Sequence, residues 1–112
     1  MSNQFQQRSI NSVPQKTTAT SVTVDTAYTV KVTDSLILLA STAGTKVLTL
    51  PATTDSLVRI TIRMTANTGG DYTASVVGGT LTFNAANETA VIVNNPPTGS
   101  WIVESLLGAT IV

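Results

Sequence analysis

The sequence predicts an all-β domain, and three observations lead to that prediction. Threonine is the most frequent residue, and valine and isoleucine are also common; these β-branched side chains lose freedom in helices and pack well on a pleated sheet. Only 11% of the residues are charged, well below the usual quarter. Short apolar and threonine-rich runs alternate with turn residues from Asp34 to Glu104. We therefore expect an antiparallel β-sandwich, jelly roll or small barrel of about eight to ten short strands.

The length of 112 residues fits one domain, but the first 20 residues differ from the rest. They are rich in glutamine, their two charges are both positive, and Ile10 and Val13 stand alone among polar neighbours. Such a segment cannot bury enough apolar surface to fold by itself. It is either a disordered tail or an arm that binds a partner. We favour an extended N-terminal arm over residues 1–20, followed by a β domain over residues 21–112.

The first half of the β domain contains four predicted strands. Residues 19–24 and 27–32 alternate apolar and polar side chains, as in half-buried strands. Residues 35–40 are apolar on both faces, which suits a central strand buried on both sides. Residues 45–50 direct their last two leucines inward, and Pro51 ends this strand because proline cannot donate to a ladder.

Residues 57–64 show the clearest alternation in the chain. One predicted face carries Val58, Ile60, Ile62 and Met64, and the other carries Arg59, Thr61, Arg63 and Thr65. The two arginines have two interpretations: a solvated outer face, or ion pairs and hydrogen bonds to a neighbouring subunit, which the planar guanidinium favours.

Turn residues divide the second half. Residues 67–71 (NTGGD) tolerate positive φ, and Gly78-Gly79 predicts a two-residue hairpin. The last predicted strands are residues 71–77, 80–83, 89–93, 100–105 and 109–112.

Candidate catalytic chemistry is nearly absent from the composition. The chain has no histidine and no cysteine, so a Ser-His or Cys-His nucleophile cannot form and a zinc site lacks ligands. Most of the six carboxylates lie beside turns, where an aspartate caps backbone N–H groups. A calcium site built from Asp34, Asp55 or Asp71 is an alternative without EF-hand spacing. We expect neither an enzyme nor a cofactor.

Charge and hydropathy restrict the partners. The net charge is zero, so no basic field favours nucleic acid. The longest apolar run, Leu36 to Ala40, is too short to cross a membrane. The N-terminus shows no signal peptide, so we expect a protein made in the cytoplasm that stays there, or leaves by lysis or in a particle.

Trp101 is the only tryptophan and has three interpretations: core packing, a subunit-interface anchor, or a platform for a sugar ring. The low aromatic content of 4% weakens the sugar interpretation. The C-terminal residues 106–112 are apolar to the end, so we expect them to be paired or buried.

Six segments occur in a recognisable order. They are residues 34–38 (DSLIL), 47–52 (VLTLPA), 60–63 (ITIR), 78–81 (GGTL), 87–93 (NETAVIV) and 99–103 (GSWIV). Together they resemble a β module of tailed-bacteriophage virion proteins, over about residues 34–104. The Leu-Pro pair and the late Gly-x-Trp are the most specific parts. The family often has glycine before the basic strand, where this chain has Asp55-Ser56.

The resemblance implies a virion structural protein. A polar arm, a neutral β domain and an apolar C-terminus are similar to the layout of head decoration, or cement, proteins, which are usually trimers. It implies a capsid decoration protein on the outer surface of the head that stabilises contacts between major capsid protein subunits after synthesis in the host cytoplasm. The alternative is a tail, fibre or head-fibre component with host-glycan contact.

The expected partners are the major capsid protein and further copies of the chain in a homotrimer, with no nucleic acid and no membrane. The residues expected to contact partners are Phe5, Arg8, Ile10, Val13, Arg59, Arg63 and Trp101.

Overall fold

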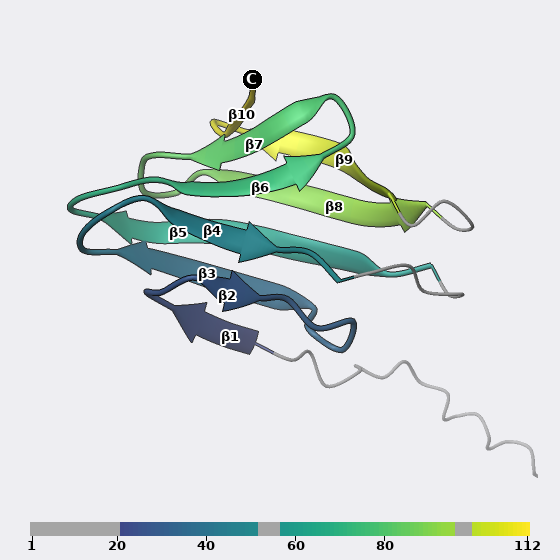
Figure 1. Cartoon of the computed structure of the whole chain (residues 1–112), viewed down its shortest axis with the longest axis horizontal. Helices are drawn as coiled ribbons and strands as arrows, with labels where there is room; N and C mark the ends of the chain where they lie inside the picture. The colour runs from purple at the N-terminus through teal and green to yellow at the C-terminus, as the bar shows by residue number, and fades with distance from the viewer. Residues whose placement is uncertain (1–20, 52–56, 96–99) are drawn as a thin grey trace, which may run out of the picture.

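Two five-stranded β-sheets stack face to face in the computed structural model, which describes residues 21–51, 57–95 and 100–112 (Figure 1). The first sheet contains, in spatial order, β1 (Ser21–Val24), β3 (Leu36–Ser41), β5 (Arg59–Asn67), β8 (Thr89–Asn95) and β9 (Ser100–Leu107). The second sheet contains β10 (Thr110–Ile111), β7 (Gly79–Phe83), β6 (Tyr72–Val76), β4 (Lys46–Thr49) and β2 (Tyr28–Thr29). The all-β prediction is confirmed, while the predicted arm over residues 1–20 lies outside the described residues.

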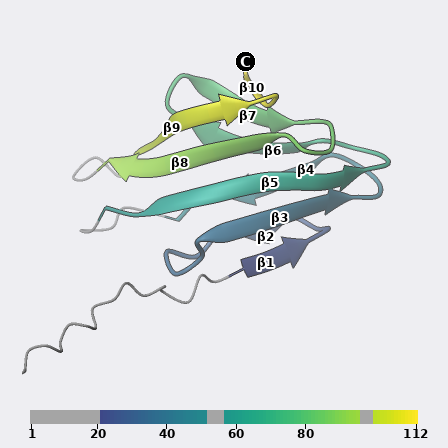
Figure 2. The same cartoon turned by 180° about the vertical axis from the view of Figure 1, so that it is seen from behind.

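The strand pairing differs from the antiparallel pattern that we expected. Four of the eight pairings are parallel, and they join β1 to β3, β3 to β5, β2 to β4 and β4 to β6. The reason is that each of the first five strands is followed by a strand in the opposite sheet, so that β1 to β6 wind in three coils of two strands (Figures 1 and 2). Strands stacked by successive coils point the same way. Antiparallel pairing begins only at β7.

The coils differ in length, which explains why no repeat is visible in the sequence. Ser21 lies beside Leu36, 15 residues later, whereas Leu36 lies beside Thr61, 25 residues later. The segments between the strands absorb the difference, so the side chains that meet across the sheet have no fixed spacing.

The core lies between the sheets and is continuous across them. One inward row of the first sheet contains Ile37, Ile62, Ala90 and Leu106. One inward row of the second contains Tyr28, Leu48, Ala74, Leu81 and Ile111. The largest completely buried side chains include Tyr72 and Phe83. The predicted inward face of β5 is confirmed, because Ile60, Ile62 and Met64 are all fully buried.

Local predictions from turn residues largely hold. β6 and β7 form the expected antiparallel hairpin, but Val77 and Gly78 make its turn, and Gly79 already pairs with Val76. β4 ends at Thr49, two residues before Pro51. The strand predicted over residues 27–32 is much shorter than expected, since only two residues pair as β2.

Candidate functional site

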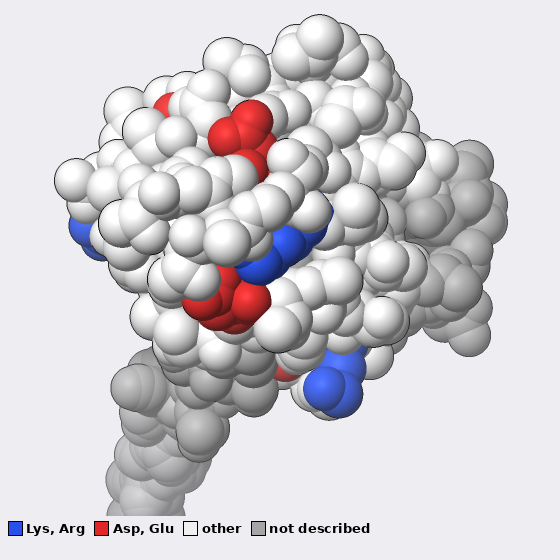
Figure 3. All heavy atoms as spheres, turned by 60° about the vertical axis from the view of Figure 1, so that its left-hand side comes forward, with Lys and Arg blue, Asp and Glu red and all other residues white. Residues whose placement is uncertain are grey.

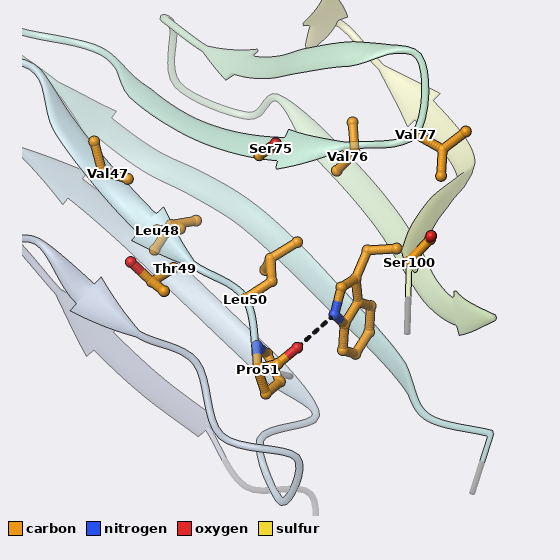
Figure 4. Close-up of a pocket in the computed structure, with 10 residues that line it drawn as sticks. Val47, Leu48, Thr49, Leu50, Pro51, Ser75, Val76, Val77 and Ser100 are labelled. Carbon is orange, nitrogen blue, oxygen red and sulfur yellow. Dashed lines mark hydrogen bonds between the residues drawn. The ribbon is translucent and has the colours of Figure 1, made fainter. Parts of the chain in front are cut away.

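Pro51 of the Leu-Pro pair and Trp101, which are far apart in sequence, meet in the fold. The indole N–H of Trp101 on β9 donates a hydrogen bond to the Pro51 carbonyl oxygen, 3.0 Å away (Figure 4). The backbone N–H of Val77 donates to the Trp101 carbonyl oxygen at 2.8 Å. These bonds connect β9 of the first sheet with the segment after β4 and the turn after β6, both belonging to the second sheet. Pro51 and Trp101, which come from two of the six segments that carry the resemblance, are therefore joined by a hydrogen bond.

Trp101 belongs to the core. Only 4% of its surface is exposed and its single donor is used. Its expected role in partner contact therefore needs correction, because a buried indole offers no face for a sugar or a subunit. The core-packing interpretation is the one that the structure supports.

A hollow of about 470 Å³ lies beside this contact. Its described walls come from β4, the segment after it, β6 and β9 (Figure 4). They consist of Val47, Leu48, Thr49, Leu50, Pro51, Ser75, Val76, Val77, Ser100 and Trp101. These walls offer apolar and hydroxyl groups and no ionisable side chain, so they suit packing contacts better than proton transfer.

The outer face of the second sheet is rich in hydroxyl groups. Strand alternation places on it Thr29, Val47, Thr49, Thr73, Ser75, Thr80, Thr82 and Thr110, opposite the buried row. Seven of these eight side chains carry a hydroxyl group and none is charged. The face can therefore approach another surface without removing the water shell from an ion.

The outer face of the first sheet combines apolar and charged side chains. The guanidinium of Arg59 donates to both carboxylate oxygens of Glu104, at 2.7 and 2.9 Å. This contact lowers the pKa of Glu104 and raises the pKa of Arg59. Arg63 donates to the side-chain oxygen of Asn87 at 2.9 Å. Both arginines are exposed, as the solvated-face interpretation requires, and both have partners within the chain.

Turn capping explains two of the aspartates. The buried carboxylate of Asp34 accepts hydrogen bonds from the Tyr28 hydroxyl at 2.7 Å and the Lys31 backbone N–H at 2.9 Å. Burial, then this carboxylate, raises the pKa of Tyr28. Asp25 accepts from the hydroxyl and backbone N–H of Thr42 at 2.7 and 3.1 Å.

Lys46 completes the turn cluster around Asp25. Its ammonium lies 3.4 Å from the Asp25 carboxylate and donates to the carbonyl oxygens of Ala43 and Gly44. Figure 3 shows this end of the molecule as mostly uncharged surface, on which side chains of opposite charge touch. The cluster joins the β1–β2 connection to the turn between β3 and β4, and we assign it a structural role.

Acid is expected to weaken this cluster. The hydrogen bonds from Thr42, and then Lys46, hold the pKa of Asp25 below its usual value. A lowered folded-state pKa contributes stability above the unfolded pKa of about 4, and this stability is lost as pH falls through the folded pKa. Urea denaturation from pH 7 to pH 2.5 should show a stability difference between the wild type and Asp25→Asn that is constant above about pH 5 and shrinks below it. A difference independent of pH would contradict this role of the Asp25 charge.

The remaining predicted contact residues are those of the N-terminal arm. Phe5, Arg8, Ile10 and Val13 lie outside the described residues.

Within residues 21–51, 57–95 and 100–112, no three acidic side chains gather as a metal site would require. The same residues contain no helix that is long and apolar enough to span a membrane. Sequence reasoning missed the hydroxyl-rich face, although the hydroxyl residues two apart in β6 (Thr73 and Ser75) and in β7 (Thr80 and Thr82) were a visible signal.

The fold and its surfaces define an all-β protein of two mixed sheets, with faces suited to packing contacts. Neither the protein-family models nor the curated proteins contain a match to this chain.

Proposed function

We propose that this chain is a bacteriophage capsid decoration protein that binds the outer surface of the head. The observation that carries the proposal is the contact between Pro51 and Trp101, because it gives the most specific parts of the resemblance one shared structural role. The sheet faces add support. The second sheet has a hydroxyl-rich face without charge, and the Arg59 charge on the first is balanced by Glu104.

The mechanism that we propose is multivalent contact. Each assembly of chains would touch several major capsid protein subunits, so modest individual contacts would combine into tight attachment and tie those subunits together. The arm over residues 1–20 would add contacts through Phe5, Ile10 and Val13, by pairing as a strand or lying in a groove of the shell. Arg8 would add a charged contact. The fibre alternative loses its aromatic platform, since Trp101 is buried.

A particle-binding experiment tests this proposal. Purified protein is mixed with heads that lack it, the heads are pelleted, and the bound copies are counted. We expect saturable binding over the whole head and greater resistance of the heads to heat. Binding confined to a single vertex, or to tails alone, would contradict the decoration role and favour the fibre alternative.

The arm is tested in the same assay. Removing residues 1–20 should abolish binding, as should the paired full-length change Phe5→Asp with Ile10→Asp. Circular dichroism and urea denaturation check that each variant is folded. Undiminished binding by folded variants would disprove the role of the arm while leaving the decoration proposal standing.

A further inference from the structure

One edge of the sandwich is much longer than the other three. The four outermost strands are β1, β9, β10 and β2. β1 has four residues and β2 and β10 have two each, whereas β9 has eight. Short edge strands are one way in which proteins prevent unwanted strand addition. Among the residues that the structure describes, β8 pairs with one side of β9 and no strand pairs with the other. The Trp101 carbonyl oxygen already accepts from the Val77 N–H of the β6–β7 turn, so the stretch that is open to another strand begins at Ile102.

Three of the exposed side chains of β9 are apolar, and the other two are Glu104 and Ser105. Ile102 and Leu106 are each 41% exposed, and Leu107 is 70% exposed. Leu106 occupies the last position of the inward row that starts at Ile37, so the apolar core of the first sheet reaches this edge and remains partly uncovered. An apolar edge strand of this length is a template for another strand.

Charge does little to protect this edge. β9 contains no lysine, arginine or proline, and its one ionisable side chain is Glu104. A shift of register between β8 and β9 makes Glu104 the extra residue of the strand. Its carboxylate is held by Arg59 on the face of the sheet. The residue that would repel a second identical edge is therefore already neutralised within its own chain.

We propose that β9 is a homotypic interface, where β9 of a second copy of this chain adds to the first sheet. Two identical strands related by a two-fold axis must run antiparallel, and the contact uses the same patch on both copies. The balanced Glu104 charge and the shared apolar side chains suit this like-on-like contact. The two first sheets then form one continuous sheet of ten strands. The edge backbone gains hydrogen-bond partners, and the apolar ends of β9 are covered.

Solution mass is the first test. We expect the wild type to contain an even number of chains by light scattering after gel filtration. Ile102→Lys and Leu106→Lys should halve that number and raise the dissociation constant about tenfold or more. The control is Val47→Lys, because Val47 is 52% exposed but lies on the second sheet; this variant should keep the wild-type mass. An odd number of chains, a wild-type monomer at high micromolar concentration, or equal masses for all variants would overturn the proposal.

Cysteine cross-linking tests the geometry without disrupting the interface. The natural sequence has no cysteine, so a single cysteine at each position from 102 to 106 reports only on contact between copies. In an antiparallel self-pair, facing residues lie about 4.5–5.5 Å apart between Cα atoms, within reach of a disulfide. One position at the two-fold axis, or the two positions that flank it, should oxidise to a covalent dimer far faster than the rest. Absence of a preferred position would overturn strand pairing even if the number of chains in solution is even.

This inference does not depend on the decoration proposal. The Leu106→Lys variant can be added to the particle-binding assay. Loss of self-association with retained head binding would show that the β9 interface and the head-binding surface act independently. The homotrimer implied by the resemblance is compatible with β9 pairing only if two trimers join through their edges, which gives six chains.

Discussion

Gly70→Ala should destabilise the protein by about 3 kcal/mol or more, because the new side chain has no room. Gly70 lies in the turn between β5 and β6, and its φ is +97°. A Cβ atom at this position would lie 2.1 Å from the carbonyl oxygen of Gly44 and 2.3 Å from its carbonyl carbon. Both are backbone atoms, so no side chain can rotate away. Relief requires the two neighbouring turns to separate.

Gly44→Ala is the matched control. Gly44 also has a positive φ, +75°, but no atom lies within 4 Å of the position that its Cβ would take. We expect a loss of about 1–2 kcal/mol from backbone conformation alone. Urea denaturation of both variants measures the difference. Equal losses would show that the close approach of the turns does not contribute, and that positive φ accounts for the whole effect.

Trp101→Ala should cost about 3–5 kcal/mol, the range for removing a buried aromatic side chain. The indole packs into the core beside the hollow, and its N–H donates a hydrogen bond to the Pro51 carbonyl oxygen. The variant leaves a cavity between the sheets and an acceptor without this partner. Loss of the contact should also loosen the segment after β4, which hydrogen exchange of nearby backbone amides would report.

Two further variants separate the causes. Trp101→Phe keeps most of the apolar volume but removes the donor, so it should cost about 1–3 kcal/mol. Val47→Ala, at an exposed position of β4 outside the proposed β9 interface, should cost about 1 kcal/mol or less. If Trp101→Phe were as damaging as Trp101→Ala, the hydrogen bond would dominate. If Trp101→Ala were as mild as Val47→Ala, Trp101 would have no packing role.

Local sequence patterns predicted most strands but not their neighbours. The alternation from Leu57 to Met64 gave both the strand and its buried face, since period 2 reports which side chains face the core. It could not report whether β5 runs parallel to β3. Each short strand pairs along its backbone, whose hydrogen-bonding groups are the same in nearly every residue. The direction of pairing depends on whether a connection returns to the same sheet or crosses to the other.

For the candidate contact residues, too, the sequence predicted local placement but not the partners. Arg59 and Arg63 were correctly placed on an outer face, but their partners Glu104 and Asn87 are 45 and 24 residues away in sequence. Trp101 had three interpretations because a tryptophan with these sequence neighbours can pack in a core, anchor a subunit or stack on a sugar. Burial between the sheets decided among them, and burial depends on the arrangement of the whole chain.

The sequence by itself determined that this protein is all-β, which segments form its strands, and which faces of the long strands are apolar. These properties depend on side chains a few residues apart. Only the tertiary structure decided that the chain coils between two mixed sheets, that Trp101 meets Pro51, and that β9 is the longest edge strand among the described residues. Those properties depend on segments brought together over tens of residues, whose spacing is set by connections of unequal length rather than by any local pattern.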